Sequence, residues 1–119
     1  MVSKFIALVF GCAAIAACQN EVVVEVSQVG DDITFVAKRD DKPACIDEVT
    51  VYRADDQLKP LWTLGAPKKV PCQSEFRYGQ DAAGFLTDGP PPKLQNGVKY
   101  AVSMRGAGQI GQGDFTKGQ

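Results

Sequence analysis

The side chains with the strongest catalytic potential in this sequence lack the partners that catalysis requires. Ser27, Ser74 and Ser103 could act as nucleophiles, but the 119-residue chain has no histidine to activate a hydroxyl. A serine–lysine pair would need a buried lysine, and no spacing in the sequence identifies one. The residues therefore favour a protein that is not an enzyme, and they indicate no cofactor.

Three pairs of aspartates could bring carboxylates together, but each pair falls at a predicted turn: Asp31-Asp32, Asp40-Asp41 and Asp55-Asp56. Aspartate is favoured in turns because its carboxylate bonds to the nearby backbone. Glycoside hydrolysis needs two carboxylates about 5 to 9.5 Å apart, and calcium needs roughly six to eight converging oxygens. We interpret the pairs as structural turns and predict no metal site, with calcium on these loops as the alternative that the sequence leaves open.

The N-terminal segment has the features of an export signal. Lys4 precedes an apolar run from Phe5 to Ala17, which is shorter than the roughly 20 residues of a membrane span. The run closes at Ile15-Ala16-Ala17-Cys18, which resembles the lipobox of bacterial lipoproteins. The resemblance implies that residues 1–17 are removed as a signal peptide and that Cys18 becomes a lipidated N-terminus.

The same resemblance implies where the mature protein resides. Gln19 follows the lipidated cysteine in place of aspartate, which is similar to lipoproteins sorted to the outer membrane. Whether the protein faces the periplasm or the cell surface is left open. Only Gln19 and Asn20 separate Cys18 from the first charged residue of the domain, so we expect residues 18–119 to form a single domain close to the bilayer.

Two of the four cysteines remain for the folded domain. Cys12 leaves with the signal and Cys18 is acylated, which leaves Cys45 and Cys72. An even pair in an exported chain predicts a disulfide, because compartments outside the cytoplasm are oxidising. A two-cysteine metal site is the alternative, but it lacks histidine partners.

The charge balance argues against a nucleic-acid partner. Loss of Lys4 with the signal leaves 12 basic and 14 acidic side chains, a formal charge of −2. Nucleic-acid binding requires a clustered basic surface. The closest approach to a basic cluster is Lys68-Lys69, which we interpret as part of a solvated loop.

Apolar and polar residues alternate by twos along the chain, which predicts an all-β fold. About seven short strands in roughly 100 residues are typical of a single antiparallel β-sandwich. The predicted strands cover residues 22–27, 33–38, 45–53, 61–64, 74–78, 98–104 and 110–116. Residues 79–96 break the pattern and predict a long connection. We interpret Pro90-Pro91-Pro92 within it as a stiff crossover between sheets, with docking to an aromatic groove as the alternative.

The segment from Leu94 to Tyr100 resembles the start of the sixth strand of a fibronectin type III domain. In that family a leucine lies six residues before a tyrosine whose hydroxyl bonds to the preceding loop, the tyrosine corner. Ile46 to Arg53 followed by Trp62 resembles the third strand and its hairpin partner. The resemblance implies an immunoglobulin-like sandwich and carries no function with it. Ala37 stands where the family usually has tryptophan.

Gly106 to Gly111 matches the glycine pattern of dinucleotide-binding motifs, but its context does not fit. That motif needs a following helix and an acidic residue about 20 positions later, and only eight residues follow Gly111. We predict a glycine-rich hairpin loop instead, with a β-bulge at Gly113.

Tyr52 and Trp62 provide the best candidate interaction surface, because an exposed aromatic pair across a hairpin would form an apolar patch. Phe76 and Phe85 are assigned to the core. We therefore predict a non-enzymatic binding or assembly module with an envelope protein or glycan partner. The alternative is a small enzyme or inhibitor that acts on glycans or peptidases.

Overall fold

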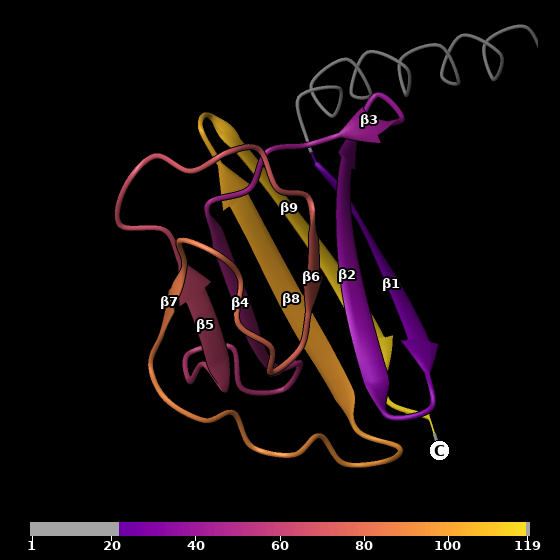
Figure 1. Ribbon diagram of the computed structural model, residues 1–119. Helices are drawn as coiled ribbons and strands as arrows, with labels where there is room; N and C mark the ends of the chain where they lie inside the picture. Colours follow the sequence, from indigo (N-terminus) through magenta and orange to yellow (C-terminus); the bar gives the residue numbers. More distant parts are fainter. Residues whose placement is uncertain (1–21, 119) are drawn as a thin grey trace, which may run out of the picture.

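The computed structural model describes residues 22–118, which form two antiparallel β-sheets that enclose a core (Figure 1). The strands are β1 (Val23–Val29), β2 (Asp32–Arg39), β3 (Lys42–Pro43), β4 (Glu48–Arg53), β5 (Trp62–Gly65), β6 (Glu75–Arg77), β7 (Leu86–Thr87), β8 (Lys99–Gly106) and β9 (Gln109–Thr116). All seven predicted strands are present. The two additional strands, β3 and β7, have two residues each.

One sheet has four strands and the other has five. In the smaller sheet β1 pairs with β2, and β2 pairs with both β3 and β6. In the larger sheet the order is β7-β5-β4-β8-β9. The β1–β2 ladder has seven consecutive pairs, from Val23 opposite Lys38 to Val29 opposite Asp32. The all-β, two-sheet prediction is therefore confirmed.

The core lies between the sheets and is built from every second residue of the long strands. Because side chains alternate across a strand, each strand contributes its apolar set to the interior. Burial of each large apolar side chain contributes about 1.5 to 3 kcal/mol. The largest of the fully buried inward side chains are Ile33, Phe35, Val49, Val51, Leu64, Val102 and Met104.

The two sheets come together at β1 and β9, and this contact depends on glycine. The Val22 amide donates to the Ile110 carbonyl over 3.2 Å. Gly111 is next in β9, and a Cβ at that position would overlap the carbonyl oxygen of Val22. The glycine therefore permits two backbones to approach more closely than any side chain would allow.

The glycine-rich segment forms the predicted hairpin loop but not the predicted bulge. β8 and β9 pair from Gly106 opposite Gln109, so the turn consists of Ala107 and Gly108. Gly113 lies opposite Val102 in an unbroken register. The bulge at Gly113 was therefore wrong. A Cβ on Gly113 would lie 3.3 Å from Val24 of the facing sheet, so this glycine accommodates close packing between strands.

The predicted disulfide is present between Cys45 and Cys72, with the two Cα atoms 4.6 Å apart. It joins the segment before β4 to the segment before β6, which belong to different sheets. The Ile46 amide donates to the Gln73 carbonyl beside the disulfide, at 2.9 Å. A closed loop with a sequence separation of 27 residues stabilises the fold by roughly 3 to 4 kcal/mol in the chain-entropy model.

The predicted tyrosine hydrogen bond is also present. Tyr100 is 2% exposed, and its hydroxyl accepts a hydrogen bond from the Gln95 amide at 2.8 Å. Leu94, six residues before Tyr100, is buried as well. The aromatic ring of Tyr100 is buried in the core, and its hydroxyl oxygen gives the Gln95 amide of the preceding loop a hydrogen-bond acceptor.

The proline segment does not cross between sheets. The strands on either side of it, β7 and β8, both belong to the five-stranded sheet, so that prediction was wrong. The segment is held by Tyr78, whose hydroxyl donates to the Pro92 carbonyl over 2.6 Å. Burial, followed by the nearby Tyr100, raises the pKa of Tyr78 to about 12, so the hydroxyl keeps its donor proton even in alkaline solution where a free tyrosine would lose it.

The close approach of β1 and β9 predicts a sharp difference between two glycines. Gly111→Ala should destabilise the protein by about 2 to 3 kcal/mol, because the new methyl group meets backbone that cannot move independently. Gly65 has open space at the Cβ position and no positive φ, so Gly65→Ala should be neutral or stabilise by up to about 1 kcal/mol. Urea unfolding of both variants measures this difference, and equal midpoints would contradict the proposed backbone contact.

Candidate functional site

The outer face of the five-stranded sheet is the candidate site. Alternation in β4 directs Val49 and Val51 into the core, where both are fully buried. Glu48, Thr50 and Tyr52 consequently point outward. The same rule applies to the neighbouring strands, so the outer side chains can be read from the strand register.

Two rows of outward residues cross the middle of this face. The first row consists of Thr63, Thr50, Ser103 and Gln112, which lie opposite one another on successive strands. The second row consists of Tyr52, Ala101 and Asp114. We call the central residues Thr50, Tyr52, Thr63, Ala101 and Ser103 the hydroxyl face, because all except Ala101 carry a hydroxyl group. Ser103 is only 7% exposed, so the accessible hydroxyl groups belong to Thr50, Tyr52 and Thr63.

Tyr52 is distinctive among the aromatic side chains of residues 22–118. Each of the other rings packs against a second ring, in the pairs Phe35–Phe115, Trp62–Tyr78, Phe76–Phe85 and Tyr100–Phe115. Tyr52 makes no such ring pair and is partly exposed on the hydroxyl face. A partly exposed tyrosine combines apolar contact area with a polar group, which suits it to association with a partner.

Ion pairs lie at the two margins of the hydroxyl face. Arg105 and Glu48 lie 3.3 Å apart at one margin, and Lys99 and Asp114 lie 3.3 Å apart at the other. All four side chains are at least 41% exposed, so each pair contributes at most about 1 kcal/mol to folding. Their main effect is to balance charge locally and leave the centre of the face uncharged.

Arg53 and Asp55 form a further pair beside Tyr52, at the end of β4. The Nε atom of Arg53 lies 3.1 Å from the Asp55 carboxylate. The hydrogen bond to Arg53, followed by its charge, lowers the pKa of Asp55. This pair lines a shallow hollow of about 420 Å³ together with Ala54 and residues 97–99.

The prediction that Tyr52 and Trp62 form an exposed pair was wrong for Trp62, which is buried. Trp62 lies opposite Val51, an inward position, whereas Tyr52 is the next residue and points outward. Trp62 is 4% exposed, and its ring contacts Tyr78 edge-on at 5.1 Å. Successive side chains of a strand point to opposite faces of the sheet. A register change of one residue therefore moves Trp62 from the outer face to the core.

The acidic pairs occupy turns and do not converge. Asp31-Asp32 and Asp40-Asp41 lie at opposite ends of the eight-residue strand β2, and Asp55-Asp56 follows β4. Asp40 and Asp41 have φ of 54° and 62°, the left-handed conformation of a tight hairpin turn that aspartate tolerates. Within residues 22–118 no three metal-ligating side chains come together.

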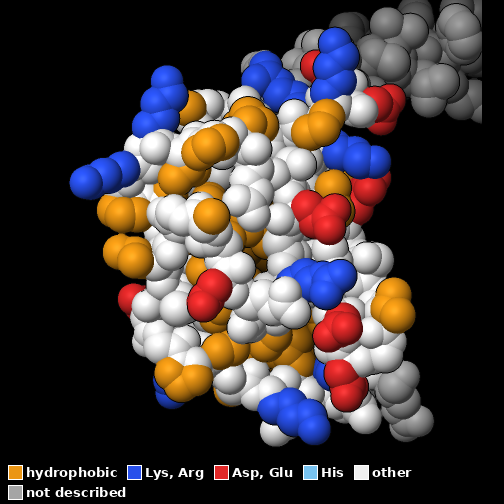
Figure 2. All heavy atoms as spheres, in the orientation of Figure 1, with side chains coloured by type: hydrophobic (Ala, Val, Ile, Leu, Met, Phe, Trp, Pro, Cys, Tyr) orange, Lys and Arg blue, Asp and Glu red, His pale blue; other side chains and the backbone are white. Residues whose placement is uncertain are grey.

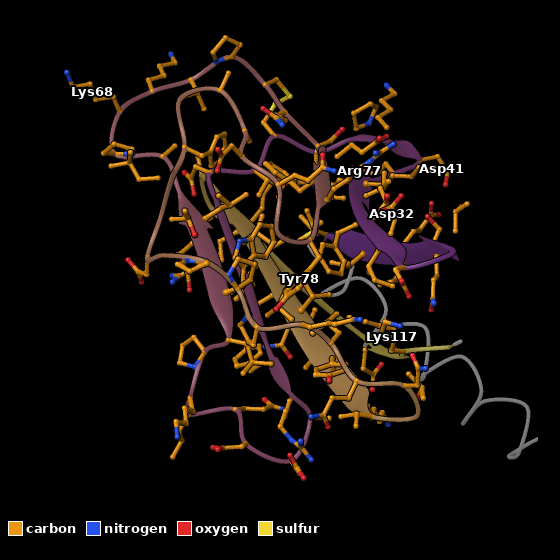
Figure 3. All side chains as sticks on the ribbon, turned by 60° about the horizontal axis from the view of Figure 1, so that its bottom comes forward. Asp32, Asp41, Lys68, Arg77, Tyr78 and Lys117 are labelled. Carbon is orange, nitrogen blue, oxygen red and sulfur yellow. A yellow bond between two sulfur atoms is a disulfide. The ribbon has the colours of Figure 1, made fainter. Side chains whose placement is uncertain are left out.

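The sequence interpretation missed a buried lysine, Lys117, which is 4% exposed. Its ammonium group donates to Asn96 Oδ1 at 2.6 Å, to Asp31 Oδ1 at 3.2 Å and to the Gly118 carbonyl at 3.1 Å (Figure 3). Three acceptors match the three donors of an ammonium group, so Lys117 holds the chain after β9 against the loops that contain Asp31 and Asn96. Nothing in the local sequence signals this burial, because its two side-chain partners, Asp31 and Asn96, are distant along the chain.

The chain matches no protein-family model, and comparison with the curated proteins finds no match. No helix within residues 22–118 is long and apolar enough to cross a membrane. Cys18 precedes the described residues, so its predicted lipidation lies outside them.

The core and surface assignments of the two aromatics predict opposite effects on stability. Trp62→Ala should destabilise by about 3 to 5 kcal/mol, as is usual for removal of a buried aromatic ring. Tyr52→Ala should cost less than about 1 kcal/mol, because the side chain is at the surface. Chemical denaturation of the two variants tests the assignment, and a larger loss in Tyr52→Ala would place the wrong residue in the core.

Proposed function

We propose that the protein is a membrane-anchored envelope lipoprotein that acts as a non-enzymatic binding or assembly module. The lipobox-like sequence before Cys18 supports the anchor. Two lipid signals are enough for stable membrane attachment, and a diacylglycerol group supplies two chains. The outer membrane is the proposed location, on the basis of Gln19.

The observation that carries the binding function is the hydroxyl face, which includes the partly exposed Tyr52. A surface built on paired strands orders few side chains on binding, which limits the entropic cost of association. Hydroxyl groups donate and accept hydrogen bonds, and the tyrosine ring adds apolar contact. This chemistry fits an envelope protein or a glycan that presents its own polar groups.

We further propose that the sandwich is immunoglobulin-like, of the fibronectin type III kind. When the two-residue strands are left out, the third, sixth and seventh strands are β4, β8 and β9, which share a sheet as in the immunoglobulin family. The fourth strand, β5, pairs with the third, as in the hairpin of the fibronectin-like pattern. The Tyr100 hydrogen bond to Gln95 adds a further point of support.

The anchor predicts that one cysteine of the N-terminal segment is essential and another is not. Cys18→Ser should release the protein from the membrane fraction or leave an uncleaved precursor, because acylation requires the thiol. Cys12→Ser is the matched control and should leave attachment unchanged. Metabolic incorporation of a fatty-acid analogue measures both variants, and label retained in Cys18→Ser would contradict the lipobox assignment.

The binding function predicts that the partner contacts the hydroxyl face and not the opposite sheet. A photoreactive amino acid at position 52 should give a discrete crosslinked product in envelope membranes. The same group at position 27, an exposed position on the other sheet, should not. Mass analysis would identify the crosslinked partner, and identical products from both positions would show that the contact is not specific to the hydroxyl face.

A further inference from the structure

One end of the domain carries an exposed loop with two adjacent lysines. Residues 66–72, which we call the lysine loop, form most of the connection between β5 and β6. Lys68 and Lys69 are exposed on it and are flanked by exposed Pro67 and Pro71. Lys68 points away from the body of the domain in Figure 3. Figure 2 shows this corner of the molecule, at the upper left, with blue and orange side chains and no red ones.

The domain holds the lysine loop at both ends. The Ala66 amide donates to the Asp47 carbonyl at 2.9 Å, and Cys72 is bonded to Cys45. Val70 packs against the core between these two points. Beside the loop lies a groove of about 460 Å³, lined also by residues 45–47 and Ala107. The two lysines therefore lie on a loop that is fixed to the domain at both ends.

The chain enters the domain at the same end (Figure 1). The Val22 amide is hydrogen-bonded to the Ile110 carbonyl near the start of β9, close to the hairpin that joins β8 and β9. Cys18 precedes Val22 by four residues, and a chain of that length spans at most about 14 Å. On a lipidated protein this end, and not the opposite one, must lie near the lipid headgroups.

Basic charge at this end is concentrated at the lysine loop. The turn between β2 and β3 lies at the same end, and it balances Arg39 and Lys42 with Asp40 and Asp41. Of the residues that line the groove, Asp47 alone is acidic, against Lys68 and Lys69. The flanking prolines add apolar surface, a combination that suits the interfacial region of a membrane.

We propose that the lysine loop rests on an anionic phospholipid surface, with Lys68 and Lys69 against the headgroup phosphates. This inference rests on the proposed lipid anchor and specifies how the anchored domain is oriented. Lysine binds phosphate as a compact charge with several donors, and short tethering raises its local concentration at the surface. Tyr52 lies toward the opposite end of β4 and is thereby directed away from the bilayer.

The test uses the mature, lipidated protein added to preformed vesicles and an amine-acylating reagent read by mass spectrometry. In vesicles that contain phosphatidylglycerol, Lys68 and Lys69 should react about fivefold more slowly than in vesicles of phosphatidylcholine alone. Lys59, in the turn at the opposite end, is the internal control and should react equally in both. High salt should remove the protection, because it screens the headgroup charge.

A variant pair separates docking from simple proximity. Lys42, in the turn between β2 and β3 at the same end, should also react more slowly in phosphatidylglycerol vesicles. Lys68→Gln/Lys69→Gln should abolish this protection of Lys42, whereas Lys59→Gln should leave it unchanged. Vesicle flotation is measured on the same samples. A protein that does not float contradicts the lipid anchor and this inference together. A protein that floats, but whose Lys68 and Lys69 react equally in both kinds of vesicle, overturns this inference alone.

Discussion

The two-residue period of the β-strand is the constraint on which the rest of this structure depends. It directs Phe35, Val49, Val51 and Val102 into one interior, and it leaves Thr50 and Tyr52 on the opposite surface. Core and candidate binding face are therefore two sides of the same strands. Any change that shifted β4 by one residue would expose the core set and bury the hydroxyl face.

The sequence was enough to predict the strands, the disulfide and the tyrosine hydrogen bond. Alternating apolar residues indicate the strands, the even number of remaining cysteines indicates the disulfide, and the spacing of Leu94 and Tyr100 indicates the hydrogen bond. Trp62 was misassigned because its face depends on the register that the β4–β5 connection sets. Gly111 and Lys117 depend on residues that are far away along the chain. Their roles arise from contacts with Val22 and Asp31, and no local spacing encodes them.

The two ends of the domain have different chemistry. Val22, the disulfide and the lysine loop lie at one end, while the Arg53–Asp55 pair and the buried Lys117 lie at the other. Tyr52 belongs to the second group, since β4 runs from the disulfide toward the distal end. An attachment at one end and a recognition surface toward the other would let one small domain hold a partner at a fixed height above a membrane.

The seven-pair ladder between β1 and β2 also has a mechanical consequence. On an anchored chain, a partner that pulls on the distal face transmits force to the membrane through the start of β1. That force runs along the strand, so it loads the pairs from Val23–Lys38 to Val29–Asp32 together. Shear of a whole ladder resists rupture better than unzipping one pair at a time. On an anchored chain, the place where the chain enters would thus load the β1–β2 ladder in shear and not by unzipping.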